Sequence, residues 1–186
     1  MPTSIYERLA AVLTYPDEDY HGRVLECVAV AKSTAGHELR KFIEKTAALS
    51  VAQLQELFAV TFELNLEGSL EAGWHLYGED GRRAALLVRL REQMRLHGVD
   101  ETKELPDHLT NVLPLLARLE HTAAAELVGT CVQPALRKML AATTGKANPY
   151  EHLLAAVAAV LQTDFPELSR KVEAASPGRA ARRAAT

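Results

Sequence analysis

The sequence predicts an all-α fold, a single-domain helical bundle of about eight to nine helices. Apolar residues recur at spacings of three and four along most of the chain, and no stretch alternates apolar and polar residues long enough to predict a strand. With 186 residues, of which 48% are hydrophobic, the chain can bury one core without disulfide bonds. We assign the helical domain to residues 1–175 and expect a disordered basic tail at 176–186, which has arginines but no apolar stripe.

Four helices are expected in the first third of the chain. Their apolar spacing places them at about 5–14, 19–33, 37–49 and 50–62. Ser4 and Ser50 are the expected N-caps, because a serine hydroxyl can accept a hydrogen bond from a free backbone N–H in the first turn. Pro16 ends the first helix, since the residue before a proline disfavours helical geometry. We expect Gly36 to separate the second helix from the third.

Five further helices are expected in the remainder. They fall at about 69–77, 80–97, 106–120, 122–143 and 150–162. Ser69 is the expected cap of the first, and Asp107 is expected to stabilise the start of the third, where Pro106 is tolerated. Pro114 and Pro134 fall inside helical patterns and should kink them. The arginines of the 80–97 helix are expected on its outer face: Arg82, Arg83, Arg89, Arg91 and Arg95.

Composition excludes several classes of protein. A net charge of −3 gives no general affinity for nucleic acid. Cys27 and Cys131 lie far apart in sequence, outside any CxxC or zinc-finger spacing, so we expect buried free thiols in a reducing compartment. The start of the chain lacks the basic and apolar regions of a secretory signal, and no run reaches the roughly 18 apolar residues of a membrane span. A cytoplasmic location follows as the expectation.

An acidic segment carries the only tryptophan. From Thr46 to Gly81 there is no lysine or arginine, and Trp74 and Tyr77 lie close together between two glycines. The acidic residues are Glu56, Glu63, Glu67, Glu71, Glu79 and Asp80. In helical geometry Leu70, Trp74 and Tyr77 would share one face. Such a surface suits a basic, partly apolar peptide, because charge attraction speeds encounter and aromatic burial holds the partner.

The same region carries a family resemblance. The runs Phe62–Asn65, Ser69–Leu70, Trp74–Asp80 and Glu104–Leu109, in this order and spacing, resemble the nitrate reductase molybdenum cofactor assembly chaperones (NarJ), a family within the TorD/DmsD class of redox-enzyme maturation chaperones. The segment Leu9–Glu18 resembles the first helix of that family and its exit.

The resemblance implies a TorD-like helical fold and a cytoplasmic chaperone that is not an enzyme and has no cofactor of its own. Its partner would be the N-terminal segment and apo form of a molybdenum oxidoreductase catalytic subunit of the respiratory nitrate reductase type, which it would keep open for cofactor insertion before membrane docking or export. The same role for a related selenate, chlorate, dimethyl sulfide or ethylbenzene enzyme is the alternative. A monomer is expected, with a dimer as the alternative.

The residues expected to contact the peptide lie in two segments, 70–80 and 104–109. They are Leu70, Glu71, Trp74, His75, Tyr77, Glu79, Asp80, Glu104, Asp107, His108 and Leu109. Apolar groups of the client would pack on the leucines and aromatic residues, and its cations would face the carboxylates. Two alternatives stay open: Trp74 and Tyr77 as core residues, and the histidines as hydrogen-bonded structural groups.

A small helical metalloenzyme is the competing hypothesis. His75, Glu79, Asp80, Glu104, Asp107 and His108 are all metal-ligand types. The chain has no HExxH motif, no His–Asp doublet and no pair of ExxH motifs. A P-loop is excluded around Gly145, since Leu140 replaces its first glycine and Ala147 its Ser/Thr. Neither the cysteines nor Ser69 have an activating context, so we predict no catalytic and no metal-binding residue.

Overall fold

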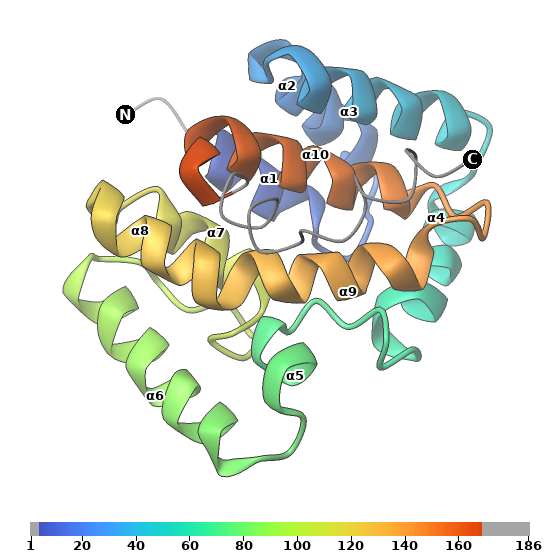
Figure 1. Ribbon diagram of the computed structural model, residues 1–186. Coiled ribbons are helices and arrows are strands. Elements are labelled where there is room, and N and C mark those ends of the chain that lie inside the picture. Colours follow the sequence, from blue (N-terminus) through green and yellow to red (C-terminus); the bar gives the residue numbers. More distant parts are fainter. Residues whose placement is uncertain (1–3, 169–186) are drawn as a thin grey trace, which may run out of the picture.

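The computed structural model describes residues 4–168, and within them all regular structure is helical (Figure 1). This confirms the predicted all-α bundle. The elements are α1 Ile5–Val12, α2 Tyr20–Val30, α3 Ser33–Thr46, α4 Val51–Phe58, the π-helical η1 Ala59–Glu63, α5 Ala72–Tyr77, α6 Gly81–Leu96, α7 Leu109–Leu116, α8 His121–Leu127, the π-helical η2 Val128–Val132, α9 Gln133–Thr143 and α10 Tyr150–Asp164. The predicted tail at 176–186 and the domain boundary at 175 lie outside the described residues.

Helix α10 is the central element. It packs against α3 on one side and α9 on the other, while α1 packs against α2 and α7 (Figure 1). Helix α6 lies at the edge of the bundle, where it contacts α5 and α7. Its buried residues Leu86, Leu90 and Met94 are spaced by four positions, as a helix with one buried face requires. No helix in the described part of the chain has both the length and the apolar character needed to cross a membrane.

An aromatic cluster forms the part of the core that leads to the surface. Tyr150 of α10 lies with its ring centroid 5.3 Å from Phe42 of α3 and 5.0 Å from Phe62 of η1. Phe62 in turn lies 5.0 Å from Phe58 of α4. Each contact is tilted or edge-on, the geometries that aromatic pairs prefer. The rings thus join α3, α4 and α10 and fix where α4 ends.

The predicted N-caps at the two serines are confirmed. The Ser4 hydroxyl accepts from the Glu7 N–H at 3.2 Å, and the Glu7 carboxylate accepts from the Ser4 N–H at 2.8 Å, which completes a capping box. Ser50 and Gln53 form the same arrangement at the start of α4. Both cysteines are buried free thiols, as predicted, and burial raises the pKa of Cys27 and of Cys131 to about 12.

Gly36 does not break a helix, contrary to expectation. It lies inside α3, which begins at Ser33, and the chain turns earlier, at Ala31, whose ψ of 136° is extended. A Cβ atom at Gly36 would lie 3.2 Å from the Ala31 carbonyl oxygen. The glycine therefore allows the first turn of α3 to approach the end of α2, which is a packing role and not a helix stop.

The internal proline of the predicted 122–143 helix is accommodated by a wider turn. Helices α8 and α9 are continuous through η2, where the Gln133 N–H donates to the Val128 carbonyl, five residues back. Pro134 follows at once, with no N–H to donate. A π-type turn at this point rearranges the backbone bonding, so the chain continues as a helix instead of ending.

We predict that Gly68→Ala lowers the free energy of unfolding by at least about 2 kcal/mol. Its added methyl group would lie 1.9 Å from the Thr61 carbonyl oxygen, a backbone atom that cannot move without displacing η1. Gly22→Ala is the matched control, because Gly22 is exposed in α2 with nothing within 4 Å of a Cβ atom. This control should raise stability by up to about 1 kcal/mol. Urea unfolding of both variants checks the pair, and equal stabilities would contradict the packing described for Gly68.

Candidate functional site

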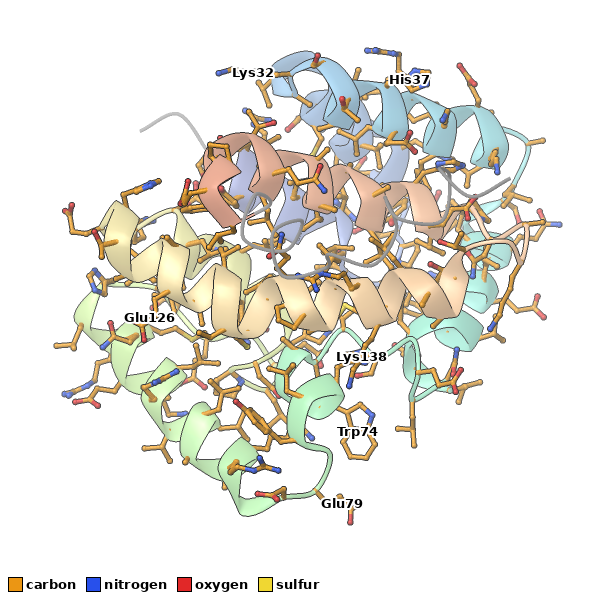
Figure 2. All side chains as sticks on the ribbon, viewed as in Figure 1. Lys32, His37, Trp74, Glu79, Glu126 and Lys138 are labelled. Atoms are coloured by element: carbon orange, nitrogen blue, oxygen red, sulfur yellow. The ribbon has the colours of Figure 1, made fainter. Side chains whose placement is uncertain are left out.

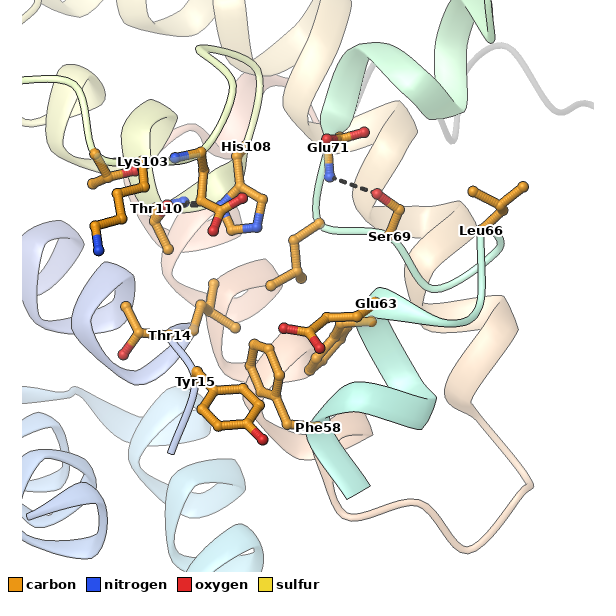
Figure 3. A pocket seen from close by; sticks show the side chains of 15 residues that line it. Thr14, Tyr15, Phe58, Glu63, Leu66, Ser69, Glu71, Lys103, His108 and Thr110 are labelled. Carbon is orange, nitrogen blue, oxygen red and sulfur yellow. Dashed lines mark hydrogen bonds between the residues drawn. The ribbon is translucent and has the colours of Figure 1, made fainter. Parts of the chain in front are cut away.

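A pocket of about 470 Å³ opens beside the end of the aromatic cluster (Figure 3). Its walls come from the end of α1, from α4 and η1, from the loop before α5 and from the loop before α7. The lining residues are Leu13, Thr14, Tyr15, Phe58, Phe62, Glu63, Leu66, Ser69, Leu70, Glu71, Thr102, Lys103, Glu104, His108 and Thr110. Segments separated by up to about one hundred positions, from Leu13 to Thr110, therefore build one hollow, which local sequence patterns cannot show.

The floor of the pocket is aromatic and rigid. Phe58 and Phe62 are each only 5% exposed and belong to the core, yet both line the pocket. Tyr15, which follows α1, packs edge-on against Phe58 with a centroid distance of 5.7 Å and leaves 49% of its surface exposed (Figure 3). An apolar side chain that enters the pocket would therefore meet a preformed aromatic surface.

The rim of the pocket is mainly acidic. Glu63, Glu71 and Glu104 contribute carboxylates from three different segments, and Lys103 contributes a single ammonium group. Carboxylates beside an apolar floor attract a cationic group that carries an apolar neighbour. Of the predicted site residues, the structure brings Leu70, Glu71, Glu104 and His108 together here.

Backbone hydrogen bonds join the loop before α5 to the loop before α7. The Leu109 N–H donates to the Leu70 carbonyl at 3.0 Å, and the Ala72 N–H donates to the Asp107 carbonyl at 2.8 Å, so that Glu71 and His108 form an isolated antiparallel bridge. The segments 70–80 and 104–109 are thus adjacent in space. Their contact is a fixed part of the fold that holds two walls of the pocket together.

Asn111 fixes the Glu104 side of the pocket, a role that the sequence did not indicate. Its buried side chain accepts from the Thr102 N–H at 2.9 Å and donates to the carbonyls of Glu104 and Leu105 at 3.1 and 3.0 Å. A buried amide that bonds three backbone groups of one loop sets the course of that loop. The polar residue within the apolar pattern of α7 was the available signal.

Arg83 occupies the place that a ligand cation was expected to take. Its Nε donates to Asp107 Oδ2 at 2.9 Å and its Nη2 to Glu71 Oε2 at 2.8 Å. Asp107 has no exposed surface and its carboxylate is bonded by Arg83, so it offers no contact to a client, and it does not cap α7, whose N-cap is His108. The expectation that Arg83 faces outward is wrong, because a buried carboxylate needs a counter-ion. Despite the opposing effect of burial, these partners raise the pKa of Arg83 above its ordinary value.

The start of α7 also differs from the prediction. The helix begins at Leu109, with His108 as its N-cap, and it ends at Leu116. Leu109 is fully buried, so it belongs to the core and offers no contact surface. Pro106 and Asp107 lie in the preceding turn, closed by the His108 N–H bonding the Leu105 carbonyl at 2.9 Å.

Helix α5 also starts later than expected, at Ala72. The Ser69 hydroxyl does not cap it but accepts from the Glu71 N–H at 3.2 Å. Leu70 therefore precedes the helix and does not share a helical face with Trp74 and Tyr77. It is 2% exposed and lines the pocket instead.

The remaining expected contacts lie outside the pocket lining, around α5 and the start of α6. Trp74 and Tyr77 are half-buried, and Glu79 is exposed in the turn between the two helices (Figure 2). The Arg83 guanidinium lies 5.6 Å from the Trp74 ring centre. Asp80 caps α6 by accepting from the Arg82 N–H at 2.8 Å. The predicted single surface is therefore divided by Arg83 into two faces.

Both histidines are hydrogen-bonded structural groups. His75 is buried with its Nε2 2.7 Å from the Ser69 carbonyl oxygen, and its own carbonyl accepts from Lys138. Burial lowers the pKa of His75. His108 Nδ1 accepts from the Thr110 N–H at 3.3 Å, and burial lowers the pKa of His108 to about 4. Within residues 4–168, no three His, Cys, Asp or Glu side chains are placed to hold a metal ion.

Comparisons with known proteins concern most of the chain. The family model described as nitrate reductase delta subunit matches residues 27–163. The nitrate reductase molybdenum cofactor assembly chaperone NarJ of Escherichia coli K12 is 28% identical over 125 residues, which cover 63% of this chain and 53% of the relative. The protein of the same name from Escherichia coli O157:H7 gives the same values. The chain thus spans about half the length of the curated relatives it matches.

We predict that His108 makes the fold sensitive to mild acid. In the unfolded chain the His108 imidazole takes up a proton near pH 6.5, whereas in the folded protein it stays neutral down to about pH 4. Stability therefore falls as the pH drops through this window. The loss amounts to at most about 3 kcal/mol. His108→Asn keeps a capping acceptor without titrating and should flatten this part of the stability curve. Urea unfolding between pH 7 and 4 measures it, and an unchanged slope in the variant would refute the assignment.

Arg83→Met should lower the free energy of unfolding by about 3–5 kcal/mol, because it leaves the buried Asp107 carboxylate without a counter-ion. Arg91→Met is the matched control on the same helix. Arg91 is 55% exposed and pairs with Glu101 at 2.8 Å, so its loss should cost less than about 1 kcal/mol. Thermal and urea unfolding of both variants give the comparison, and similar losses would contradict the importance of burial at Asp107.

Proposed function

Because the chain belongs to the nitrate reductase delta subunit family, we propose that it is a non-catalytic chaperone that assists molybdenum cofactor insertion into an oxidoreductase of the nitrate reductase type. It acts in the cytoplasm on the N-terminal segment of the apo catalytic subunit, before that subunit docks at the membrane or is exported. The names of the Escherichia coli relatives support the assembly role. The pocket supports the capture of a peptide.

The observation that carries this proposal is an acidic rim over an aromatic floor. A cationic side chain can face Glu63 or Glu104 while an apolar neighbour packs on Tyr15 and Phe58. A pterin dinucleotide carries phosphate groups, and three carboxylates around the pocket would repel them. The charge of the pocket therefore favours the client polypeptide over the cofactor as its ligand.

The segments that line the pocket also carry exposed apolar side chains. Leu66 lines the pocket and is 64% exposed, and large apolar residues are exposed on the same segments: Val60, Leu64 and Leu105. Exposed apolar residues on the walls of a concave site are typical of a protein-binding surface. These observations support contacts on η1 and its neighbouring loops in preference to the Trp74–Tyr77 face, on which the sequence interpretation centred.

Binding energy alone accounts for the proposed action. No bond is broken, so a chaperone needs only to bind the apo subunit more tightly than the mature one, whose N-terminal segment is engaged elsewhere. Charge attraction at the rim speeds encounter, and added salt weakens it by screening. Apolar burial on the aromatic floor is insensitive to screening and holds the peptide.

Leu66→Ser should weaken binding of a synthetic N-terminal peptide of a respiratory nitrate reductase catalytic subunit by roughly tenfold, the value of one lost leucine contact. Leu96→Ser is the matched control, since Leu96 at the end of α6 is 63% exposed and lies outside the pocket lining. The affinity of the Leu96→Ser variant for the peptide should equal that of the wild type. Calorimetry at two salt concentrations measures both variants. Absence of wild-type binding, or equal losses in the two variants, would overturn the proposal.

A further inference from the structure

Glu71 belongs to two environments at once. It lines the pocket, and its carboxylate also accepts from Arg83 at 2.8 Å. Its side chain keeps 28% of its surface exposed, whereas that of Arg83 keeps 15%. A ligand in the pocket can therefore reach a carboxylate that an internal cation already holds from the other side.

The two carboxylates that hold Arg83 are unequal. Asp107 is fully buried and receives the Arg83 Nε at 2.9 Å, with a second, longer contact of 3.4 Å from Nη2. Glu71 receives a single contact and is partly solvated. Ion pairs weaken as solvent screens them, so the bond to Glu71 is the one that can be exchanged while Asp107 keeps Arg83 in place.

We infer that Arg83 is a specificity-determining residue of the pocket: it is the internal counter-ion of Glu71, so that a ligand cation binds Glu71 only in competition with it, and Trp74 reports the exchange. The inference concerns the pocket of the proposed function but does not depend on which polypeptide that pocket takes. A ligand must therefore compete with Arg83. A weakly basic ligand gains no binding energy at Glu71, whereas a well-placed cation forms a complete ion pair with its carboxylate.

Trp74 is suited to report the exchange. The Arg83 guanidinium lies 5.6 Å from the centre of its ring, within the range of a cation–π contact. Although Asp107 keeps Arg83 in place, the charge beside the ring changes when Glu71 no longer neutralises Arg83. Trp74 lies outside the pocket lining, so a small ligand in the pocket does not touch it. It is also the only tryptophan in the chain, so its emission is an unmixed signal.

The first experiment compares phenethylguanidinium with phenethylurea, which have nearly the same shape but differ in charge. With the full chain, the guanidinium should bind saturably and change the Trp74 emission, and the urea should not. Glu71→Gln should abolish the emission change, and Glu79→Gln, an exposed acid in the same segment but outside the pocket, should leave it intact. Equal responses to both compounds, no binding of the guanidinium, or a retained response in Glu71→Gln would overturn the inference.

The second experiment separates competition from mere support of the fold. Arg83→Lys keeps a cation for Asp107 but loses the fork that reaches both carboxylates. Releasing Glu71 should tighten phenethylguanidinium binding, measured by calorimetry, by roughly fivefold. In the Glu71→Gln background the same substitution should have no effect. Weaker or unchanged binding in Arg83→Lys, with helical content checked by circular dichroism, would contradict the inference. The test with these compounds is independent of the proposed function. If the client peptide does not bind, the compounds still show whether Arg83 competes for Glu71.

Discussion

The ion pair between Arg83 and Asp107 is the interaction on which the site depends. A carboxylate with no exposed surface is tolerated only beside a counter-ion, and Asp107 finds it on another helix. That requirement draws the loop before α7 onto α6, and the Ala72–Asp107 and Leu109–Leu70 backbone bonds then draw the loop before α5 to the same place. Gly73 allows the close approach, since a Cβ there would lie 2.5 Å from Asp107 Oδ2. The buried Asp107 carboxylate thus determines the position of two walls of the pocket, the loops before α5 and α7.

The same interaction divides the marked sequence region into two faces. Residues before α5 turn toward the pocket, whereas Trp74 and Tyr77 lie beside the arginines of α6. Neighbours in sequence therefore serve different surfaces. The pocket floor comes instead from Tyr15, Phe58 and Phe62, which extend the core to the surface. Because Phe58 and Phe62 belong to the core, this part of the floor does not need to be ordered when a ligand arrives, which lowers the entropic cost of binding.

Local rules predicted the parts of the fold that local physics determines. The apolar spacing of helices such as α6, and the caps at Ser4 and Ser50, depend on residues within a few positions of one another. Arg83 was misplaced because helical periodicity assigns a charged residue to solvent unless a partner is known, and its partner is 24 positions away. Asn111 and Tyr15 were missed for the same reason. Four lining residues, Leu70, Glu71, Glu104 and His108, were predicted because they lie in the sequence segments that form the two joined loops.

Residues of a family motif can support the fold without forming the binding surface. Asp107, His75, His108 and Leu109 lie in the runs that carry the resemblance, yet each is buried, hydrogen-bonded or both. Their chemistry is used to hold loops, while the surface offered to a partner comes from residues such as Leu66 and Glu63. Since domains of this size are stable by only about 5–15 kcal/mol, removing a buried ion pair consumes much of that margin. Loss of partner binding after substitution of Asp107 would therefore reflect collapse of the pocket walls, whereas loss after substitution of Leu66 reflects a missing contact.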